Sequence, residues 1–361
     1  MENAKKIKVA VGMSGGVDST ITALLLEKQG FDVVGLTMKI WNNEFKFKTL
    51  GKGCFGPNAK KNVLDAQKAA KKIGIPHFTL DLSQEFKKIV LKYFQEEYQK
   101  GKTPNPCIVC NAKIKFGLFA DKALKSGVDF DFFATGHYVN KTFDKNKKLY
   151  LLKRGTDKTK DQSYFLYRLN QKQLSKIMFP LGKMTKEEIK KLARQNGLEN
   201  YAEKKESQNF IACKDYSTIM PTCLPGKIID PQGHPLGTHK GISFYTIGQR
   251  NLNLGGLKEP HYVIEIDAEK NLIVAAPKKY LYADNVLATD LNWIVPLKFI
   301  KKKNIQVKIR YGSPLVDATF VKKGLKTAYL RFKKPQLAVT PGQSIVFYDN
   351  ETILGGGIIT K

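Results

Sequence analysis

A glycine pair between an apolar strand and an apolar helix constrains this chain more than any other feature of its sequence. It lies in the stretch VGMSGGVDSTITALLL, at residues 11–26. The residues before the pair alternate and then become continuously apolar, and those after it are apolar at helical spacing. We therefore predict a strand over 6–13, a tight turn, and a helix over 19–29 that ends at Gly30.

Strands and helices continue to alternate as far as residue 138. The further predicted strands are 32–40, 77–82 and 131–138, and the further predicted helices are 60–73, 84–99 and 111–125. Such alternation implies parallel strands joined by right-handed crossovers. The fold class predicted is α/β, a doubly wound parallel sheet with its ligand crevice at the carboxyl ends of the strands.

The sequence pattern changes after about residue 204. Before that point we expect a hairpin over 139–155 and helices over 162–176 and 185–196, the last with a capping box from Thr185 to Glu188. Beyond it, short apolar runs are broken by Gly, Pro and Asn, which is typical of small β-rich domains. The predicted domains are 1–204, a central one over 205–280, and a C-terminal β-barrel over 281–361.

Charge and cysteine content indicate the environment and the partner. Lysine and arginine number 61 against 32 acidic residues, a formal charge of +29 that favours a polyanion such as nucleic acid. A lysine excess that merely solvates the surface is the alternative. The five cysteines are an odd number, and neither a signal peptide nor a membrane span is evident, so free thiols and a cytoplasmic location without membrane association are expected.

The turn itself has the composition of a phosphate-binding loop. Gly15 and Gly16 leave room for backbone N–H groups to approach phosphates, and the hydroxyls of Ser14 and Ser19 can add donors. Asp18 would repel a phosphate unless it holds Mg²⁺ or caps backbone donors. The Walker A lysine is absent, so the pattern indicates a different loop for pyrophosphate and metal. A simple glycine turn with an N-cap is the alternative.

Several motifs in order along the chain carry a resemblance to one family. SGGVDS resembles the loop of the ATP pyrophosphatases, whose domain is of the adenine nucleotide hydrolase type. The further motifs are TPNPCIVCN at 103–111, ATGHY at 134–138, KDQSYFLY at 160–167, TIGQR at 246–250, AVTPGQSIVFY at 338–348 and LGGGII at 354–359. Together they resemble the tRNA-specific 2-thiouridylases over essentially the full length.

The resemblance implies a transferase that uses ATP and Mg²⁺ on tRNA. The wobble uridine of the anticodon stem-loop is adenylated on its C2 oxygen, and sulfur from a cysteine persulfide, loaded by a donor protein, then attacks C2. The residues implied to bind ATP are Gly12, Met13, Ser14, Gly15, Gly16, Val17, Asp18, Ser19, Met38 and Gly136. Those implied to bind tRNA are Asn105, Pro106, Cys107, His137, Lys160, Asp161, Gln162, Arg310, Tyr311 and Gln343. An ordinary polar strand end is the alternative for His137, and a solvated surface side chain for Arg310.

The implied catalytic residues are Asp18, Cys110 and Cys213. Cys110 matches the nucleophilic cysteine and precedes the helix predicted from 111, where a helix N-terminus and lysines would lower the thiol pKa. The spacing CIVC could instead be half of a zinc or iron–sulfur site, with Cys54 or Cys213 completing it. No second CxxC pair is present, so no bound metal is expected beyond Mg²⁺.

The persulfide cysteine departs from the family pattern. In the stretch ESQNFIACKDY, Ile211 occupies the place of that cysteine and Cys213 lies two residues later, a displacement of about 6.6 Å in an extended chain. A shifted loop could bring Cys213 into place, sulfur could reach Cys110 by way of Cys107 or a cluster, or the chain could be a paralogue that adenylates the same uridine for another nucleophile. A catalytically silent tRNA-binding protein is a further alternative, which the intact glycine loop disfavours. The basic charge and the β-rich tail argue against a synthetase acting on a small carboxylate.

Overall fold

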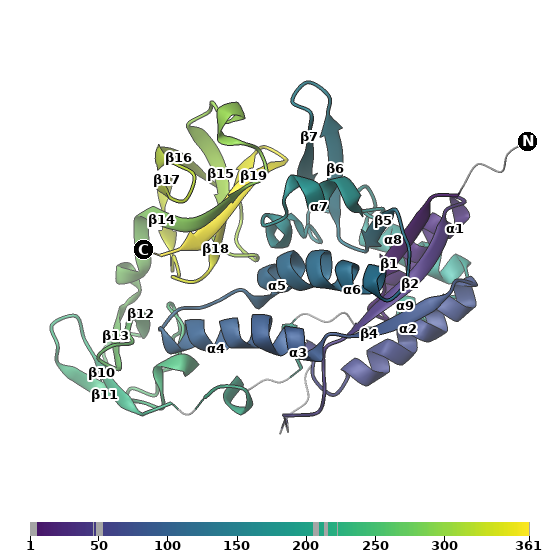
Figure 1. The fold of residues 1–361 in the computed structure, drawn as a ribbon. Helices are drawn as coiled ribbons and strands as arrows, with labels where there is room; N and C mark the ends of the chain where they lie inside the picture. The colour runs from purple at the N-terminus through teal and green to yellow at the C-terminus, as the bar shows by residue number, and fades with distance from the viewer. Residues whose placement is uncertain are drawn as a thin grey trace, which may run out of the picture. The chain divides into compact units, whose positions relative to one another are not determined.

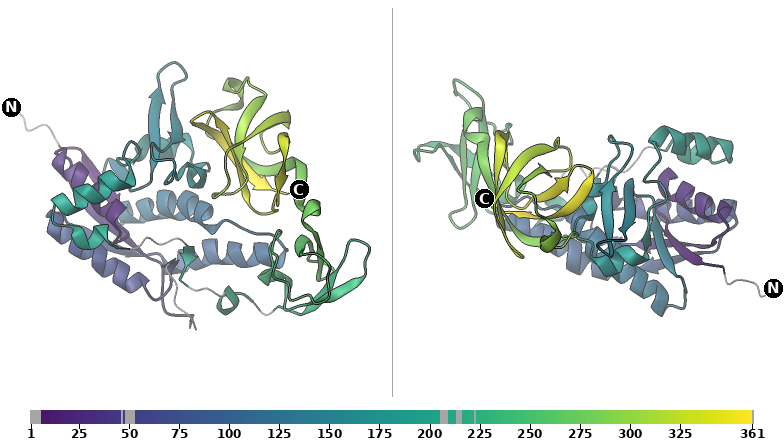
Figure 2. Two further views of the ribbon diagram at one scale, coloured as in Figure 1. Left: turned by 180° about the vertical axis from the view of Figure 1, so that it is seen from behind. Right: turned by 90° about the horizontal axis from the view of Figure 1, so that it is seen from above.

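The fold is described from a computed structural model of the chain (Figure 1). The described residues are 6–45, 47, 53–204, 209–212, 216–221 and 223–360. The chain divides into two compact units. Unit 1 comprises 1–89, 107–214 and 351–353, and unit 2 comprises 90–106, 215–350 and 354–361. Figure 2 shows both units from two further directions.

Unit 1 is built on a five-stranded parallel sheet, which confirms the predicted fold class. Its strands are β1 (Lys8–Gly12), β2 (Asp32–Lys39), β4 (His77–Asp81), β5 (Phe132–Thr135) and β8 (Ile177–Met178), in the order β4-β2-β1-β5-β8. Strand β1 has β2 on one side and β5 on the other, so the chain winds in opposite directions from this point. A crevice is expected outside the carboxyl ends of β1 and β5.

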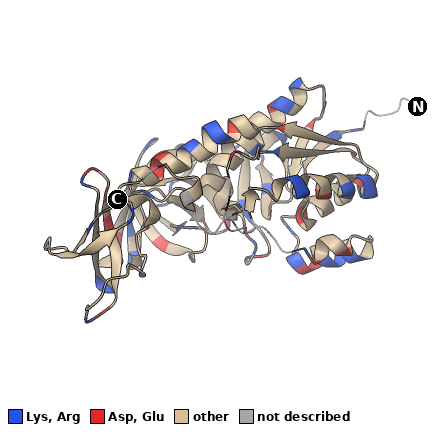
Figure 3. Cartoon of the chain, turned by 90° about the horizontal axis from the view of Figure 1, so that it is seen from below, with Lys and Arg blue, Asp and Glu red and all other residues tan. Residues whose placement is uncertain are grey.

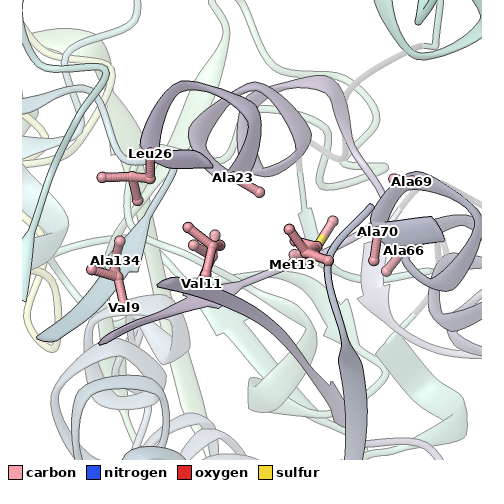
Figure 4. Close-up of a cluster of buried hydrophobic side chains, with 11 residues drawn as sticks. Val9, Val11, Met13, Ala23, Leu26, Ala66, Ala69, Ala70 and Ala134 are labelled. Carbon is pink, nitrogen blue, oxygen red and sulfur yellow. The ribbon is translucent and has the colours of Figure 1, made fainter. Parts of the chain in front are cut away.

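Helices pack on both faces of this sheet. The helices of unit 1 are α1 (Val17–Lys28), α2 (Ala59–Ile73), α3 (Ser83–Phe86), α5 (Pro106–Val109), α6 (Phe119–Lys125), α7 (Gln171–Lys176), α8 (Lys186–Gln195) and α9 (Glu199–Ala202), with π-helices η1 (Lys87–Leu91) and η2 (Cys110–Leu118). Two of these elements, η1 and α5, cross a unit boundary in sequence. Alanines of α2 let it lie close to the apolar side chains of β1 and α1 (Figure 4). Phe133 points to the opposite face, where it contacts Phe116 and Phe119.

Three of the predicted helices differ from those observed. Helix α1 begins at Val17 rather than Ser19, because Gly16 is its N-cap. The helix predicted over 111–125 begins at Pro106, since proline is favoured in the first turn. The helix predicted over 162–176 is wrong: a 3₁₀ turn, η3 (Ser163–Leu166), is followed by α7, because the capping box of Asn170 and Gln173 starts a new helix. The capping box of Thr185 and Glu188 on α8 is confirmed.

The hairpin after the sheet is also confirmed, as β6 (Val139–Asp144) and β7 (Leu149–Arg154). A short parallel pair was not expected from the sequence. It joins β3 (Gly53–Phe55) to β9 (Asn209–Ile211), with Phe55 opposite Ile211. A Cβ atom on Gly53 would lie 2.2 Å from the backbone of Ile211, so only glycine permits this contact.

Unit 2 is β-rich, as the sequence predicts, but it also contains α4 (Lys92–Gln99). Its smaller sheet has the order β11-β10-β13-β12, from β10 (Gly226–Ile229), β11 (Pro235–His239), β12 (His261–Asp267) and β13 (Leu272–Pro277). The larger sheet contains β14 (Tyr282–Trp293), β15 (Asn304–Lys308), β16 (Val316–Lys323), β17 (Ala328–Leu337), β18 (Ser344–Asp349) and β19 (Thr352–Ile359). It closes into a barrel, because β14 pairs with both β17 and β19.

Lysine and arginine are spread over helices and loops, with fewer acidic residues between them (Figure 3). The short turns η4 (Tyr216–Thr218), η5 (Ile242–Phe244), η6 (Lys278–Leu281) and η7 (Leu297–Phe299) connect the elements of unit 2. Within the described residues, no helix has the length and apolar character that crossing a membrane requires.

Candidate nucleotide and thiol site

A cavity of about 250 Å³ lies in unit 1 at the carboxyl ends of β1, β2 and β5. Its wall includes Gly12, Met13, Ser14, Asp18 and Ser19 from the turn after β1, and Met38 from β2. Thr135, Gly136 and His137 follow β5 and line it from the other side of the switch point, and Gln162, Cys54 and Lys115 also contribute. Seven of the ten predicted ATP-binding residues thus line one cavity, where a doubly wound sheet is expected to bind its ligand; Gly15, Gly16 and Val17 belong to the same loop but do not line it.

The two glycines of the loop have different roles. Gly15 has φ +73°, and a Cβ atom there would lie 2.4 Å from the carbonyl oxygen of Asn62 on α2. A side chain at Gly15 would thus collide with the protein itself, so this glycine lets the loop pack on α2. A Cβ atom on Gly16 meets only the hydroxyl of Ser14, at 3.6 Å. Of the pair, Gly16 is the one whose missing side chain leaves open space at the start of α1.

The serines of the loop are bonded to the loop itself. The Ser19 hydroxyl is buried, accepts a hydrogen bond from the Ser14 backbone N–H at 3.1 Å, and donates to the Gly16 carbonyl at 3.2 Å. The two serine hydroxyls are 3.3 Å apart. Ser19 thus fixes the curvature of the turn, which keeps the N–H groups of the first turn of α1 together. Val17 is buried against α8 and contributes its backbone, because its side chain belongs to the core.

Asp18 is held by two side chains that the sequence did not single out. Its Oδ1 accepts a hydrogen bond from the Tyr138 hydroxyl at 2.6 Å and from Lys186 Nζ at 2.7 Å. The Lys186 side chain is 7% exposed and that of Asp18 is 27% exposed, so the pair is screened from bulk water but borders the cavity. A cation is thereby fixed beside the loop without the Walker lysine.

Lys204 also stabilises the loop, on the side that packs on α2. Its Nζ donates to the Gly15 carbonyl at 2.9 Å and pairs with Asp65 on α2 at 2.6 Å. Lys186 and Lys204 lie about 170 and 190 residues from the loop in sequence, and 55 lysines offer no local signal that marks these two. One signal was available for Lys186, since it follows Thr185 in a helix whose first turn otherwise carries acidic residues.

Gly136 brings the end of β5 against the loop. A Cβ atom on Gly136 would lie 2.8 Å from the carbonyl carbon of Asp18 and 3.0 Å from the nitrogen of Ser19. His137 follows, and its Nδ1 is 2.8 Å from the Thr135 hydroxyl. Burial, assisted by the charge of Lys115, holds the pKa of His137 well below its usual range, so the imidazole is neutral at neutral pH.

The charges of three cysteine thiols interact with one another and with Lys115, and one of them, Cys54, lines the cavity. Cys107 and Cys110 come from the helix that starts at Pro106, and Cys54 comes from β3. Burial raises the pKa of both Cys107 and Cys110 to about 12, and the positive charge of Lys115 opposes the rise. The expectation of a lowered pKa at Cys110 is therefore wrong for this state. Cys110 lies one turn inside the helix, not before it, so desolvation outweighs the helix N-terminus.

The candidate persulfide cysteine, Cys213, lies outside the described residues. The preceding residues are described: Ile211 is 1% exposed and pairs with β3, and the Ala212 N–H donates to the Phe55 carbonyl at 2.8 Å. Cys54 borders the cavity, and its thiol donates to the Phe210 carbonyl at 3.1 Å. Cys54 and the strand leading to Cys213 are thus tied together.

The segment 160–162, implied to contact tRNA, has three different environments. Gln162 lines the cavity, and its Oε1 accepts from the Tyr138 N–H at 3.2 Å. Asp161 is buried, where it accepts hydrogen bonds from Arg154 Nε at 3.0 Å and from the N–H groups of Gly155 and Ser163 at 3.1 Å. Its side chain shapes the turn rather than facing solvent. Lys160 is half-buried.

Unit 2 carries the other implied tRNA contacts. The Gln343 side-chain amide donates to the Thr103 carbonyl at 2.9 Å, and Gly342 packs on the same backbone. Gln343 therefore stabilises the backbone segment that precedes Asn105 and Pro106. In the barrel, Arg310 and Tyr311 are exposed, as an RNA contact requires.

The residues present fit ATP and a magnesium ion. Asp18 lines the cavity with a carboxylate, and beside it α1 begins at Gly16, where a Cβ atom would meet only the Ser14 hydroxyl. One carboxylate together with phosphate oxygens is a common way to hold Mg²⁺. Across the described residues, no group of three or more His, Cys, Asp or Glu is arranged to hold a metal ion.

Known proteins resemble the chain over its full length. The tRNA methyl transferase HUP domain family matches residues 7–213, the tRNA methyl transferase PRC-barrel domain family matches 217–277, and the aminomethyltransferase beta-barrel domain family matches 283–359. The tRNA-specific 2-thiouridylase MnmA 2 of Thermoanaerobacter sp. strain X514 is 45% identical over 98% of both chains. The tRNA-specific 2-thiouridylase MnmA of Endomicrobium trichonymphae is 45% identical over 98% of this chain and 99% of its own. Among solved structures, a 4-thiouridine synthetase–RNA complex with bound ATP is 16% identical, with a TM-score of 0.37, and the match covers 59% of this chain and 46% of that one.

Proposed function

The chain belongs to the family of tRNA-specific 2-thiouridylases, and from this premise we propose that it replaces the C2 oxygen of a tRNA wobble uridine with sulfur at the expense of ATP. The single observation that supports this proposal best is the meeting of the SGGVDS loop and Gly136 around one cavity at the switch point of the sheet. Such a loop suits a diphosphate. A methyl transfer, which the name of the matching HUP domain family mentions, has no need of a diphosphate-binding loop.

The proposed reaction has two steps. The C2 oxygen of the uridine attacks the α-phosphate of ATP, pyrophosphate leaves, and C2 becomes bonded to a good leaving group. The terminal sulfur of the Cys213 persulfide then attacks C2, and the C2–O bond breaks so that AMP leaves with the original oxygen. The Cys110 thiolate attacks the Cys213 sulfur, so the S–S bond breaks, 2-thiouridine is released and a Cys110–Cys213 disulfide forms, which an external thiol reductant returns to two thiols. Mg²⁺ would neutralise the phosphate charge, and Asp18 would hold it while Lys186 keeps the carboxylate in place.

We assign the remaining roles as follows. Cys110 is the nucleophilic thiol, and Cys213 carries the persulfide delivered by a donor protein. Unit 1 supplies the chemistry, and Arg310 with Tyr311 on the exposed barrel surface contacts the anticodon stem-loop. The predicted division into 1–204, 205–280 and 281–361 remains our proposal for the functional domains, and the cytoplasm is the proposed place of action.

Reconstitution tests the proposal. Purified protein, ATP, Mg²⁺ and unmodified substrate tRNA are incubated with inorganic sulfide as the sulfur source, and the tRNA is digested for nucleoside mass spectrometry. We expect 2-thiouridine that depends on ATP. AMP formation without 2-thiouridine would favour a paralogue that uses another nucleophile. Binding of tRNA with neither product would identify a silent binding protein.

A further inference from the structure

Lys115 is a cation on the cavity wall that neither the loop nor the sequence motifs account for. It lies on η2, one helical turn after Cys110, and borders the cavity together with Gly136, His137 and Cys54. The side chain is half-buried. Within the described part of the chain, no carboxylate forms an ion pair with it, so its charge is available to the cavity and to the thiols beside it.

The wide turns of the π-helix η2 determine on which face of the helix Lys115 lies. In an α-helix, two residues five apart differ by about 140° around the axis, so Cys110 and Lys115 would point in different directions. Hydrogen bonds from residue i+5 to residue i, such as that from the Phe119 N–H to the Ile114 carbonyl, widen the turn and bring position 115 round to the side of the helix that carries position 110, as i+4 is brought to i in an α-helix. The widened helix therefore puts the lysine on the face that carries the thiol.

Gln173 stabilises this unusual helix from outside. Its side-chain amide donates to the carbonyl oxygens of Ala112 at 3.1 Å and Phe116 at 2.8 Å. Its Oε1 accepts from the Asn170 N–H at 3.0 Å, which completes the capping box of α7. One side chain thus joins the start of α7 to two consecutive turns of η2.

Among the described residues, the other titratable groups whose charges interact with Cys110 or Lys115 offer Cys110 no positive charge. His137 is neutral, because burial and Lys115 hold its pKa well below its usual range. Cys54 and Cys107 would only oppose a second negative charge. Lys115 is the charge that lowers the pKa of Cys110 against the effect of burial. A nucleophilic thiol in this position needs such a cation, since the thiolate is the reactive form.

We propose that Lys115 is a positioning residue for the nucleophile: its ammonium group stabilises the Cys110 thiolate, and the π-helical turn held by Gln173 aligns the two. The proton of the thiol leaves to water, and no bond other than S–H breaks in this step. The inference rests on the proposed function only in assigning Cys110 as the nucleophile. The lysine–thiolate pairing itself can be measured without tRNA or ATP.

Alkylation of Cys110 by iodoacetamide, resolved by peptide mass spectrometry between about pH 7 and about pH 10, tests the pairing. Below the thiol pKa the rate rises tenfold for each pH unit, and we expect Lys115→Met to displace this line by about one pH unit, hence about tenfold slower alkylation at a fixed pH. Lys115→Arg should keep the wild-type line, because it keeps the charge. Lys113→Met removes an exposed lysine of the same helix and is the matched control, expected to change nothing.

A second variant tests the alignment without removing the charge. Gln173→Glu keeps an acceptor for the Asn170 N–H but loses the two donors to η2, so it should also slow alkylation of Cys110. A wild-type pH profile in Lys115→Met would overturn the proposal, as would an equal shift in Lys113→Met. If Lys115→Met slows alkylation as expected but the wild-type protein forms no 2-thiouridine, the proposed function is contradicted and the pairing of Lys115 with Cys110 stands.

Discussion

Asp18 shows how one residue can be recognised from sequence while its partners cannot. A carboxylate in a phosphate loop is conspicuous, and its place on the cavity wall agrees with the role expected of it. Tyr138 and Lys186, which bond to it, come from the end of the ATGHY motif and from a helix about 170 residues away. Only the fold brings them together, because contacts between distant segments leave no periodic pattern in the sequence.

Replacing Asp18 by Asn removes the charge and keeps the shape. We expect AMP formation to fall at least about 100-fold, because the variant loses the carboxylate that we propose to hold Mg²⁺ and that bonds to Lys186. Binding of tRNA, measured by filter retention, should remain within about twofold of the wild type. Asp121→Asn, at an exposed position of α6, is the control. Loss of tRNA binding with unchanged AMP formation would contradict the assignment.

Asp161 was expected to contact RNA, but in the structure its side chain is bonded to groups of the protein. Its side chain is 1% exposed and accepts from Arg154 and two backbone N–H groups. Truncation to Ala would leave Arg154 half-satisfied, and we expect the free energy of unfolding in urea to fall by about 3 kcal/mol. A variant of unchanged stability that bound tRNA weakly would return Asp161 to the RNA surface.

At the scale of elements, regular patterns were predictable and exceptions to them were not. The strand, turn and helix at 8–28 follow from apolar periodicity, and α8 follows from its capping box. Strand β14 has no clear apolar alternation, because its residues are largely polar or half-buried and Asp290 takes a positive φ within it. The π-helix η2 has no local signature, since its two extra-wide turns are held by Gln173 from another helix.

The approach of β5 to the loop gives a prediction at this scale. In Gly136→Ala, the new methyl would meet backbone atoms of Asp18 and Ser19 at 2.8–3.0 Å, so the loop must move. We expect ATP to bind at least about tenfold more weakly by calorimetry, since displacing packed backbone costs about 1–3 kcal/mol. Gly255→Ala, where a Cβ atom meets nothing within 4 Å, should bind ATP normally. Normal binding in both variants would show that the loop tolerates a shift.

At the scale of the whole molecule, the composition predicts affinity for a polyanion, and the pattern along the sequence predicts the order of the domain types. An α/β half followed by β-rich parts is what the structure shows. The membership of residues 90–106 in unit 2 was not foreseeable, because this helix follows directly from unit 1 in sequence. Helix α4 joins unit 2 because it packs on η5 and because its Phe94 ring contacts Tyr216 of η4, both more than 100 residues later in the chain.

The formal charge of +29 predicts salt-dependent binding of tRNA. If about six phosphates are neutralised, the affinity should fall about 10³-fold between about 50 mM and about 200 mM salt. The slope of log affinity against log salt concentration measures this directly. A flat slope would show that the lysine excess solvates the surface without meeting RNA.

The fate of the uridine oxygen tests the central claim most directly. Substrate tRNA carrying ¹⁸O at C2 of the wobble uridine is incubated with the protein, ATP, Mg²⁺ and sulfide, and the AMP is analysed by mass spectrometry. If the cavity adenylates the C2 oxygen before sulfur attacks, the AMP gains one ¹⁸O for each 2-thiouridine formed. Unlabelled AMP beside 2-thiouridine would contradict adenylation of that oxygen.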